Sequence, residues 1–249
     1  MPLETAIRRY AVLFFTAFLL LVGVAFFRSY YANPLQHSGE TVHAHGVAMT
    51  LWCLLLVTQG FLIRRDQCRL HRLFGWASIP LFAVNVLLQP LAVLKLAPQI
   101  EHLWWFGDLT AQGFVFLSQA LLGTALFAVF YLLALLSRKA PVPHGAFMLC
   151  TVFPILAPVT DRIVNGYFPG LGAAMPAVAG LALVPLIAWV IADALLLGLA
   201  VWDWRSHRRL RVFPLAIALM AAYQVFTVNA DRILLWRIFS VWFMDIDFI

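Results

Sequence analysis

The residues best suited to do chemistry in this chain are two Asp-Arg pairs, Asp161-Arg162 and Asp231-Arg232. Each pair lies near the end of a stretch that is apolar enough to cross a membrane. A charged side chain at membrane depth costs about 2.5–3.5 kcal/mol on insertion scales, so it is rarely kept there without a use. A carboxylate can act as a general acid or base, and an arginine can hold an anionic group. The pairs therefore predict a site.

A second kind of chemistry is offered by three closely spaced histidines, His37, His43 and His45. Neutral imidazole is a common ligand of zinc, copper and iron. Two residues apart on a regular helix, His43 and His45 point about 200° apart, so joint ligation requires His43 to precede the helix. Two interpretations stay open, a metal ligand and a hydrogen-bonded histidine at the membrane interface.

Three further histidines, His71, His144 and His207, begin predicted helices in basic surroundings. One interpretation places them beside lipid phosphates at the membrane surface. The other is ligation of haem by two histidines on neighbouring helices. His71 and His144 are the matched pair for that role, because both lie at the start of a helix on the same side.

Other polar residues are expected at the depth of the Asp-Arg pairs, facing a shared interior pocket. They are Asn85, Gln89, Gln119 and Asn229, together with His45. Asp193 is a separate case, near the middle of an apolar run. Its carboxyl group could relay a proton, or it could hydrogen-bond to a neighbouring helix.

The composition shows what kind of structure holds these residues. The chain has 249 residues, of which 63% are hydrophobic and 11% are charged, and its mean hydropathy is +0.91. Soluble domains are about 25% charged, so a soluble globular protein is excluded. The net charge of +6 comes from short basic clusters between apolar runs. That distribution indicates membrane topology rather than nucleic-acid binding.

We expect an all-α polytopic bundle in a single membrane domain over residues 1–249, because lipid offers an open backbone no partners. Seven stretches are long enough to cross about 30 Å of hydrocarbon. They are 10–30, 43–63, 73–96, 112–136, 145–164, 178–202 and 212–236. The loops that hold most of the Lys and Arg residues alternate, which places the N-terminus in the cytoplasm and the C-terminus outside.

Three local features refine this picture. Pro154 and Pro158 each remove a helical hydrogen bond, which predicts a kink below Asp161. The Gly/Pro-rich segment 165–177 suits a re-entrant or interfacial lid. The residues from Arg237 to Ile249 mix aromatic, aliphatic and acidic side chains, which predicts a short interfacial helix.

Four stretches carry a resemblance to a known family. They are V-H-A-H-G-V at 42–47, L-H-R-L-F-G-W-A at 70–77, P-H-G-A-F-M-L at 143–149 and A-D-A-L-L-L-G-L-A-V-W-D-W-R at 192–205. The chain resembles, over residues 37–235, a widespread group of bacterial multi-pass inner-membrane proteins without an assigned function. His45, His71 and His144 match its pattern, and Gly145 stands where that group has a basic residue. The membrane histidines also resemble those of cytochrome-b-type helical proteins, which implies haem.

The leading hypothesis is a redox-type protein of the bacterial inner membrane. It would bind haem b or a transition metal through His43, His45, His71 or His144.

Two alternatives stay open, and with them whether the chain is an enzyme. In one, the protein acts on a lipid or isoprenoid, with Asp161 or Asp231 as general acid or base and Arg162 or Arg232 holding the headgroup. In the other, it is a proton-coupled transporter or receptor that uses Asp193. The expected partners are the bilayer and a lipid-like or small apolar ligand.

Overall fold

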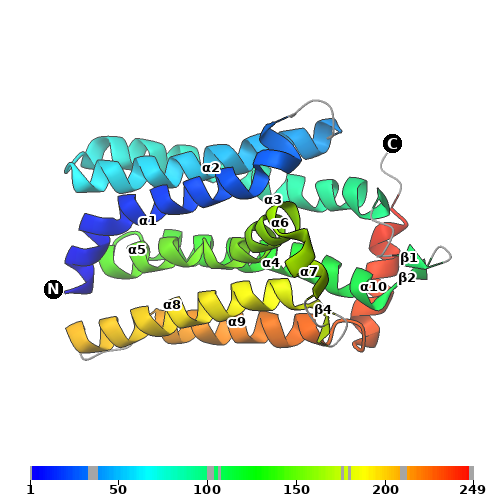
Figure 1. Ribbon diagram of the computed structural model, residues 1–249. Helices are drawn as coiled ribbons and strands as arrows, with labels where there is room; N and C mark the ends of the chain where they lie inside the picture. The colour runs from blue at the N-terminus through cyan, green and yellow to red at the C-terminus, as the bar shows by residue number, and fades with distance from the viewer. Residues whose placement is uncertain are drawn as a thin grey trace.

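The computed structural model describes residues 2–32, 39–99, 104–105, 108–174, 177–178, 181–207 and 212–246. Within these ranges the chain is all-α apart from two short antiparallel hairpins. Their strands are β1 (Trp104–Trp105), β2 (Asp108–Leu109), β3 (Ala177–Val178) and β4 (Leu181–Ala182). The long helices lie side by side along one axis, as Figure 1 shows. The predicted all-α bundle is confirmed.

The first half of the chain forms four long helices. They are α1 (Leu3–Phe26), continued by the π-helical turn η1 (Phe27–Tyr31), α2 (Glu40–Arg64), α3 (Cys68–Leu96), continued by the 3-10 turn η2 (Ala97–Gln99), and α4 (Ala111–Leu136). The start of α4 has a clear local cause, because the Thr110 hydroxyl accepts a hydrogen bond of 3.1 Å from the Gly113 N–H. Such a cap satisfies one of the free N–H groups of the first turn.

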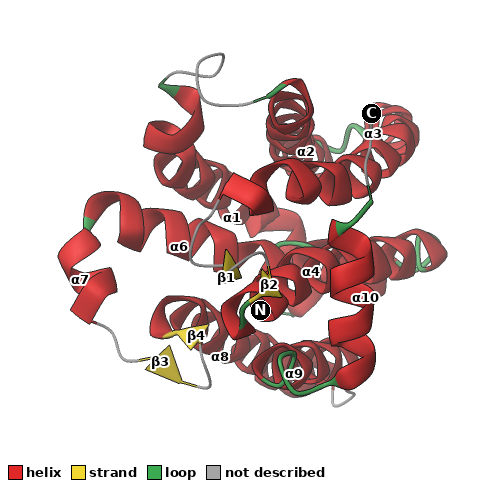
Figure 2. Ribbon diagram, turned by 90° about the vertical axis from the view of Figure 1, so that its right-hand side faces the viewer, coloured by secondary structure: helices red, strands yellow, loops and turns green. Residues whose placement is uncertain are grey.

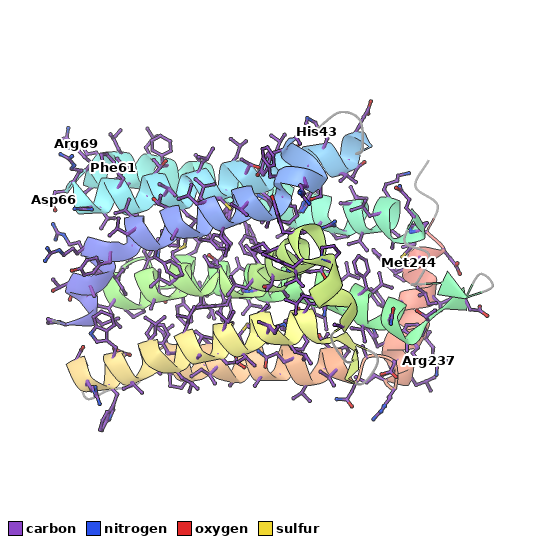
Figure 3. All side chains as sticks on the ribbon, viewed as in Figure 1. His43, Phe61, Asp66, Arg69, Arg237 and Met244 are labelled. Carbon is purple, nitrogen blue, oxygen red and sulfur yellow. The ribbon has the colours of Figure 1, made fainter. Side chains whose placement is uncertain are left out.

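A tight turn joins α2 to α3. The Gln67 N–H donates to the Leu62 carbonyl at 2.9 Å, and Asp66 has a φ of 58°. Aspartate tolerates this left-handed conformation better than most residues, because its short polar side chain can bond locally. Arg8 of α1 forms an ion pair with Asp66. The pair ties α1 to the end of the bundle where Figure 3 labels Asp66 and Arg69, which we call the N-terminal end.

The fifth apolar segment is broken rather than continuous. It consists of α5 (Pro141–Cys150), the 3-10 turn η4 (Phe153–Ile155) and α6 (Leu156–Tyr167). The break falls at Pro154 and just before Pro158, which lack the N–H that a continuous helix needs. Thr151 and Phe153 are buried, so the irregular backbone is shielded by protein. The kink predicted from the prolines is present.

The short helix α7 (Pro169–Ala174) follows α6. Over the predicted lid, 165–177, residues 165–167 complete α6, 169–174 form α7 and Ala177 begins β3. Residues 175–176 lie outside the described ranges.

The last part of the chain departs most from prediction. It forms α8 (Leu183–His207), α9 (Phe213–Val228) and α10 (Leu234–Met244). A single helix over 212–236 was wrong, because α9 ends at Val228 and residues 229–232 form turns. The Ala230 N–H donates to the Thr227 carbonyl and the Arg232 N–H to the Asn229 carbonyl. Figure 2 shows α10 lying across the end of the bundle, which we call the C-terminal end.

Helix α4 lies at the centre of the bundle and contributes to both hydrophobic cores. Phe127 and Tyr131 pack into one core with α1 and α2. Phe130 and Ala134 pack into the other, with α5, α8 and α9. Figure 2 shows the other helices arranged around α4. Part of the α4 surface stays exposed, at Leu132 and Leu136, so a helix that is apolar all round suits both the cores and lipid.

Two glycines allow helices to approach closely. A Cβ on Gly60 of α2 would lie 2.9 Å from the Val12 Cα of α1. A Cβ on Gly145 of α5 would lie 2.9 Å from a methyl carbon of Ile7. Small residues at such contacts are typical of membrane helix packing. A side chain at position 145 would therefore require Ile7 to shift.

Six segments in the described ranges are long and apolar enough to cross a membrane. They are Leu3–Tyr31, Glu40–Arg64, Cys68–Gln99, Ala111–Leu136, Pro141–Tyr167 and Leu186–Ser206. Large apolar side chains such as Leu20, Leu87 and Val190 are more than 60% exposed on their surfaces. An exposed apolar surface of this kind suits lipid rather than water. The region of the predicted seventh span, 212–236, contains α9, a shorter apolar helix of 16 residues.

Candidate functional site: a histidine pair at the N-terminal end

His71 and His144 lie next to one another at the N-terminal end. Their ring centroids are 6.2 Å apart and the ring planes are inclined at 79°. His71 is in the first turn of α3 and His144 in the first turn of α5, which begins at Pro141. Proline is favoured at the first position of a helix, since its missing N–H is not needed there. These two helix starts bring together the residues that the sequence paired.

The orientation of His144 is set by the preceding helix. Its Nδ1 lies 2.8 Å from the Ala134 carbonyl oxygen in the last turns of α4. A carbonyl oxygen only accepts, so Nδ1 carries the proton and Nε2 keeps its lone pair. Metal-binding histidines are commonly oriented by such a bond to a backbone carbonyl.

His71 contributes a nitrogen that is free to bind. Its Nδ1 is buried and has no hydrogen-bond partner among the described residues. Beside it, Gln59 of α2 donates from Nε2 to the His71 backbone carbonyl at 3.2 Å. The Gln59 Oε1 is also buried without a partner. Helices α3 and α5 thus bring the two imidazoles together, and α2 brings the Gln59 amide to the backbone of His71.

The two ring nitrogens can serve as ligands of one metal ion. With metal–nitrogen bonds of about 2.0–2.1 Å, two imidazoles on one metal have centroids roughly 5–6 Å apart, depending on the bond angle. The 6.2 Å separation is close to the upper limit. Among the described residues no group of three His, Cys, Asp or Glu side chains is close enough to hold a metal. A third ligand would therefore be Gln59 or a small molecule.

The histidines at the start of α2 are arranged differently. His43 and His45 both lie inside α2, which begins at Glu40, so they point to different faces. The His43 Nδ1 lies 2.9 Å from the Tyr30 hydroxyl, while the His45 Nδ1 is buried without a partner. Joint metal ligation by His43 and His45 is thus disfavoured by the position of the helix start. His37 lies outside the described residues.

A cavity of about 210 Å³ lies beside Asp161 and Arg162, between the end of α1 and α6. Its other lining residues are Ala25, Arg28, Ser29, Asn165 and Gly166. The Asn165 side chain donates to the Asp161 carboxylate at 2.8 Å. Among the described residues, its lining comes from α1, η1 and α6, without Asp231, Gln89 or Gln119.

Arg28 is a residue of this cavity that sequence reasoning missed. It donates to the Gly166 carbonyl at 2.7 Å and lies over the Tyr167 ring at 4.8 Å. The available signal was its position in F-R-S-Y-Y at the end of the first span, beyond the basic loops that set the topology. The lining therefore carries two arginines and one aspartate.

The second Asp-Arg pair has a different environment. Asp231 and Arg232 lie in the turn after α9, not in a helix. One carboxylate oxygen of Asp231 is buried and has no hydrogen-bond partner among the described residues, while Arg232 is exposed. The two pairs have similar sequences but do not line a common cavity.

Of the remaining predicted residues, Asp193 bonds to a neighbouring helix, whereas Asn229 bonds locally. Gln224 of α9 donates to the Asp193 carboxylate of α8 at 3.0 Å, which is the helix-bonding role considered for Asp193. The Asn229 side chain, just after α9, donates to the Val225 carbonyl of that helix. Gln89 is half-buried on α3.

Gln119 and Asn85 each have one buried atom without a partner. The Gln119 Nε2 is such an atom, although the Gln119 carbonyl accepts from the Tyr223 hydroxyl at 3.4 Å. Asn85 donates to the Ala48 carbonyl of α2 at 3.2 Å and leaves its Oδ1 unpartnered.

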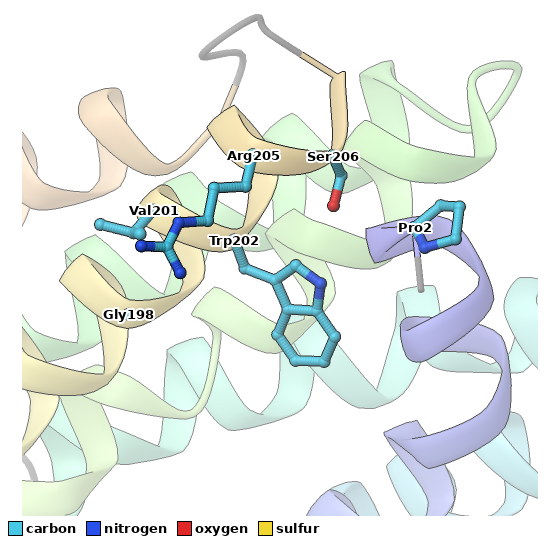
Figure 4. Close-up of a pocket in the computed structure, with 6 residues that line it drawn as sticks. All are labelled: Pro2, Gly198, Val201, Trp202, Arg205 and Ser206. Atoms are coloured by element: carbon cyan, nitrogen blue, oxygen red, sulfur yellow. The ribbon is translucent and has the colours of Figure 1, made fainter.

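A larger cavity, of about 600 Å³, lies away from all of these residues. Figure 4 shows it between the start of α1 and the end of α8, with the Trp202 indole facing Pro2. It is open on one side and has Arg205 and Ser206 at its edge. None of the predicted site residues lines it.

No protein-family profile, curated protein or solved structure matches this chain.

Proposed function

We propose that this protein is an integral membrane protein that binds a transition metal ion between His71 and His144 and uses it in a redox role. The observation that carries the proposal is the contact between the two imidazoles, whose ring centroids are 6.2 Å apart. The two rings belong to helices that start at the same end of the bundle. His144 is oriented by a backbone carbonyl, and the His71 Nδ1 is buried without another partner. A buried imidazole nitrogen without a partner is costly unless something binds it.

Iron and copper are the metals that fit both the ligands and the role. Imidazole nitrogen suits iron, copper, nickel and zinc, of which zinc does not change its oxidation state. Haem b is the second form of the same proposal, in which His71 and His144 would hold the haem iron. A macrocycle needs a slot between α3 and α5, and the two cavities described above lie elsewhere. A metal ion without a porphyrin therefore suits the pair better.

The proposed topology has seven spans in the bacterial inner membrane, with the N-terminus in the cytoplasm and the C-terminus outside. Helix α9 would be the seventh span. Its 16 residues measure about 24 Å, and the turn at 229–233 would complete the crossing. Helix α10, which lies across the end of the bundle in Figure 2, would then rest in the interface.

Elemental analysis and an absorption spectrum of the purified protein test the proposal. We expect about one iron or copper per chain, or a Soret band if the metal is carried by haem. A protein that holds neither, and that fails to take up copper or iron on incubation, would rule the proposal out.

A second candidate function is favoured by the cavity beside Asp161. Arg28 and Arg162 would hold an anionic lipid headgroup there, and Asp161 would act as general acid or base on it. The test is native mass spectrometry of protein taken from mixed-lipid nanodiscs. Preferential retention of phosphatidylglycerol over phosphatidylcholine, lost in Arg28→Gln, supports this candidate, and equal retention of both lipids contradicts it.

A further inference from the structure

Polar side chains recur every seven residues on the facing sides of α2 and α3. On α2 they are His45, Trp52 and Gln59, and on α3 they are His71, Ser78 and Asn85. Seven residues make about two helical turns, so each set lies on one face of its helix. We call these six residues the α2–α3 polar stripe.

The two halves of the stripe face one another because α2 and α3 are antiparallel neighbours. At the N-terminal end, Gln59 donates to the His71 carbonyl. At the other end, Asn85 donates to the Ala48 carbonyl, about one turn from His45. The stripe thus has one polar group near each end of the helix pair.

A third polar group lies in the middle of the stripe. The Ser78 and Tyr131 hydroxyl oxygens are 2.6 Å apart. Ser78 donates to the Gly75 carbonyl, so the Tyr131 hydroxyl donates to Ser78. The Trp52 ring centroid lies 5.2 Å from that of Tyr131, and all three side chains are buried. The polar atoms here are shielded from lipid by the bundle itself.

Buried polar atoms without a protein partner are concentrated on this stripe. Of the ten such side-chain atoms in the described residues, five lie on α2 and α3, and all five belong to the stripe. They are His45 Nδ1, Trp52 Nε1, Gln59 Oε1, His71 Nδ1 and Asn85 Oδ1. Leaving such an atom unsatisfied costs about 1–3 kcal/mol, and in proteins the missing partner is commonly a buried water.

The stripe extends across most of the thickness of a membrane. From His45 to Gln59 is 14 positions, or about 21 Å along the helix. This is about two-thirds of the hydrocarbon thickness of about 30 Å. Successive polar groups are about 10 Å apart along the axis, a gap that side chains and a few waters in file can bridge.

We propose that the α2–α3 polar stripe holds a file of water molecules and conducts protons between the two ends of the bundle. A proton that enters beside His45 passes along hydrogen-bonded waters to Tyr131 and Ser78, and leaves beside His71. No atom is oxidised or reduced, and the side chains return to their starting state. This activity goes beyond the proposed metal binding and does not require it.

The alternative role of the stripe is to pair α2 with α3, since interhelical hydrogen bonds stabilise membrane helix contacts. The two roles differ in one property that can be measured. Helix pairing predicts lower stability when the stripe is altered, but no proton movement in the unaltered protein. Conduction predicts that the middle group controls the rate.

Reconstituted vesicles test the proposal, with a pH-sensitive dye inside and a potassium diffusion potential driving proton entry. We expect the wild-type protein to raise the rate of proton entry about tenfold over that of protein-free vesicles. This is equivalent to an activation barrier about 1.4 kcal/mol lower. Tyr131→Phe and Ser78→Ala return the rate to that of protein-free vesicles. Tyr223→Phe is the matched control. Tyr223 is likewise a buried tyrosine with a hydrogen-bonded hydroxyl, which donates to the Gln119 carbonyl, but it lies on α9 and outside the stripe.

Two results would overturn the proposal. One is a rate of proton entry with the wild-type protein that equals the rate in protein-free vesicles. The other is a rate with both Tyr131→Phe and Ser78→Ala that equals the wild-type rate. Trp52→Phe is a second variant in case Tyr131→Phe does not fold, and it is expected to slow conduction because it loses one N–H of the stripe. The metal content of these variants, measured in parallel, separates a failure of this proposal from a failure of metal binding.

Discussion

The two ends of this bundle use polar residues in opposite ways. At the N-terminal end, contacts through His71 link Gln59, His71 and His144 of three helices. At the C-terminal end, the two Asp-Arg pairs share a sequence pattern but occupy separate places, one on α6 and one in a turn. The position of a helix boundary therefore decides whether similar polar residues can act together.

The difference follows from how each helix begins or ends. Turns bring the starts of α3 and α5 to the same end, and these starts carry the two histidines. Helix α9, in contrast, ends three residues before Asp231, and α10 then runs across the bundle, as Figure 2 shows. The first arrangement converges on a site, and the second does not.

The largest effect is expected from removing either member of the histidine pair. His71→Ala and His144→Ala should each lower bound metal to less than about a tenth of the wild-type level, since one imidazole and its geometry are lost. Elemental analysis measures this. His43→Ala is the control at the other end of α2, where the imidazole contacts Tyr30, and its metal content should not change. Equal loss in all three variants would contradict the assignment.

The next effect concerns the helix contact that supports the N-terminal half. Gly60→Ala should lower the free energy of unfolding by about 1–3 kcal/mol, because the new Cβ overlaps the Val12 backbone of α1. Gly23→Ala is the matched control, because no atom lies within 4 Å of its added Cβ. Thermal unfolding in detergent compares the two variants. An unchanged midpoint in Gly60→Ala would show that α1 and α2 do not pack this closely.

A smaller effect is expected at the cavity of the first Asp-Arg pair. Arg28→Gln should weaken retention of phosphatidylglycerol about tenfold, the loss expected for one charge-assisted contact of roughly 1.4 kcal/mol. Arg232→Gln should leave retention unchanged, because Arg232 is exposed beyond the end of α9. Native mass spectrometry of each variant measures retention. Equal retention of phosphatidylglycerol by the two variants would contradict the proposal that the cavity beside Asp161, and not the turn at Asp231, binds the lipid headgroup.

The smallest effect is expected for the hydrogen bond between α8 and α9. Asp193→Leu should cost about 0.6–1.7 kcal/mol of stability, the range of interhelical hydrogen bonds in membranes, because Gln224 loses its acceptor. Asp193→Asn keeps an acceptor oxygen and should behave almost as the wild type. If Asp193→Asn lowers the free energy of unfolding as much as Asp193→Leu does, the negative charge of Asp193 itself stabilises the contact.

Much of the fold could be predicted from the sequence, because apolar length and proline position act locally. Six apolar segments became helices of membrane length, and the break at Pro154 lies where its missing N–H requires it. The end of α9 was not predicted, because the apolar residues Ile233 to Trp236 continue the apolar run beyond the Asp231-Arg232 pair. Backbone bonds from Ala230 and Arg232 close turns there instead.

The candidate site was predictable only in part, for a similar reason. The shared position of His71 and His144 at helix starts was visible in the sequence. The contributions of Gln59 and Arg28 were not, since both depend on which helices are neighbours. Gly60 shows the same limit, because only the packing against Val12 reveals why no side chain is tolerated there.

The most direct test of metal binding by the histidine pair is to count the imidazole nitrogens on the metal. Pulsed electron paramagnetic resonance of the copper-loaded protein provides this count. We predict two imidazoles in the wild-type protein, and one in His71→Ala and in His144→Ala at high copper concentration. A count that neither substitution changes would show that His71 and His144 do not hold the metal.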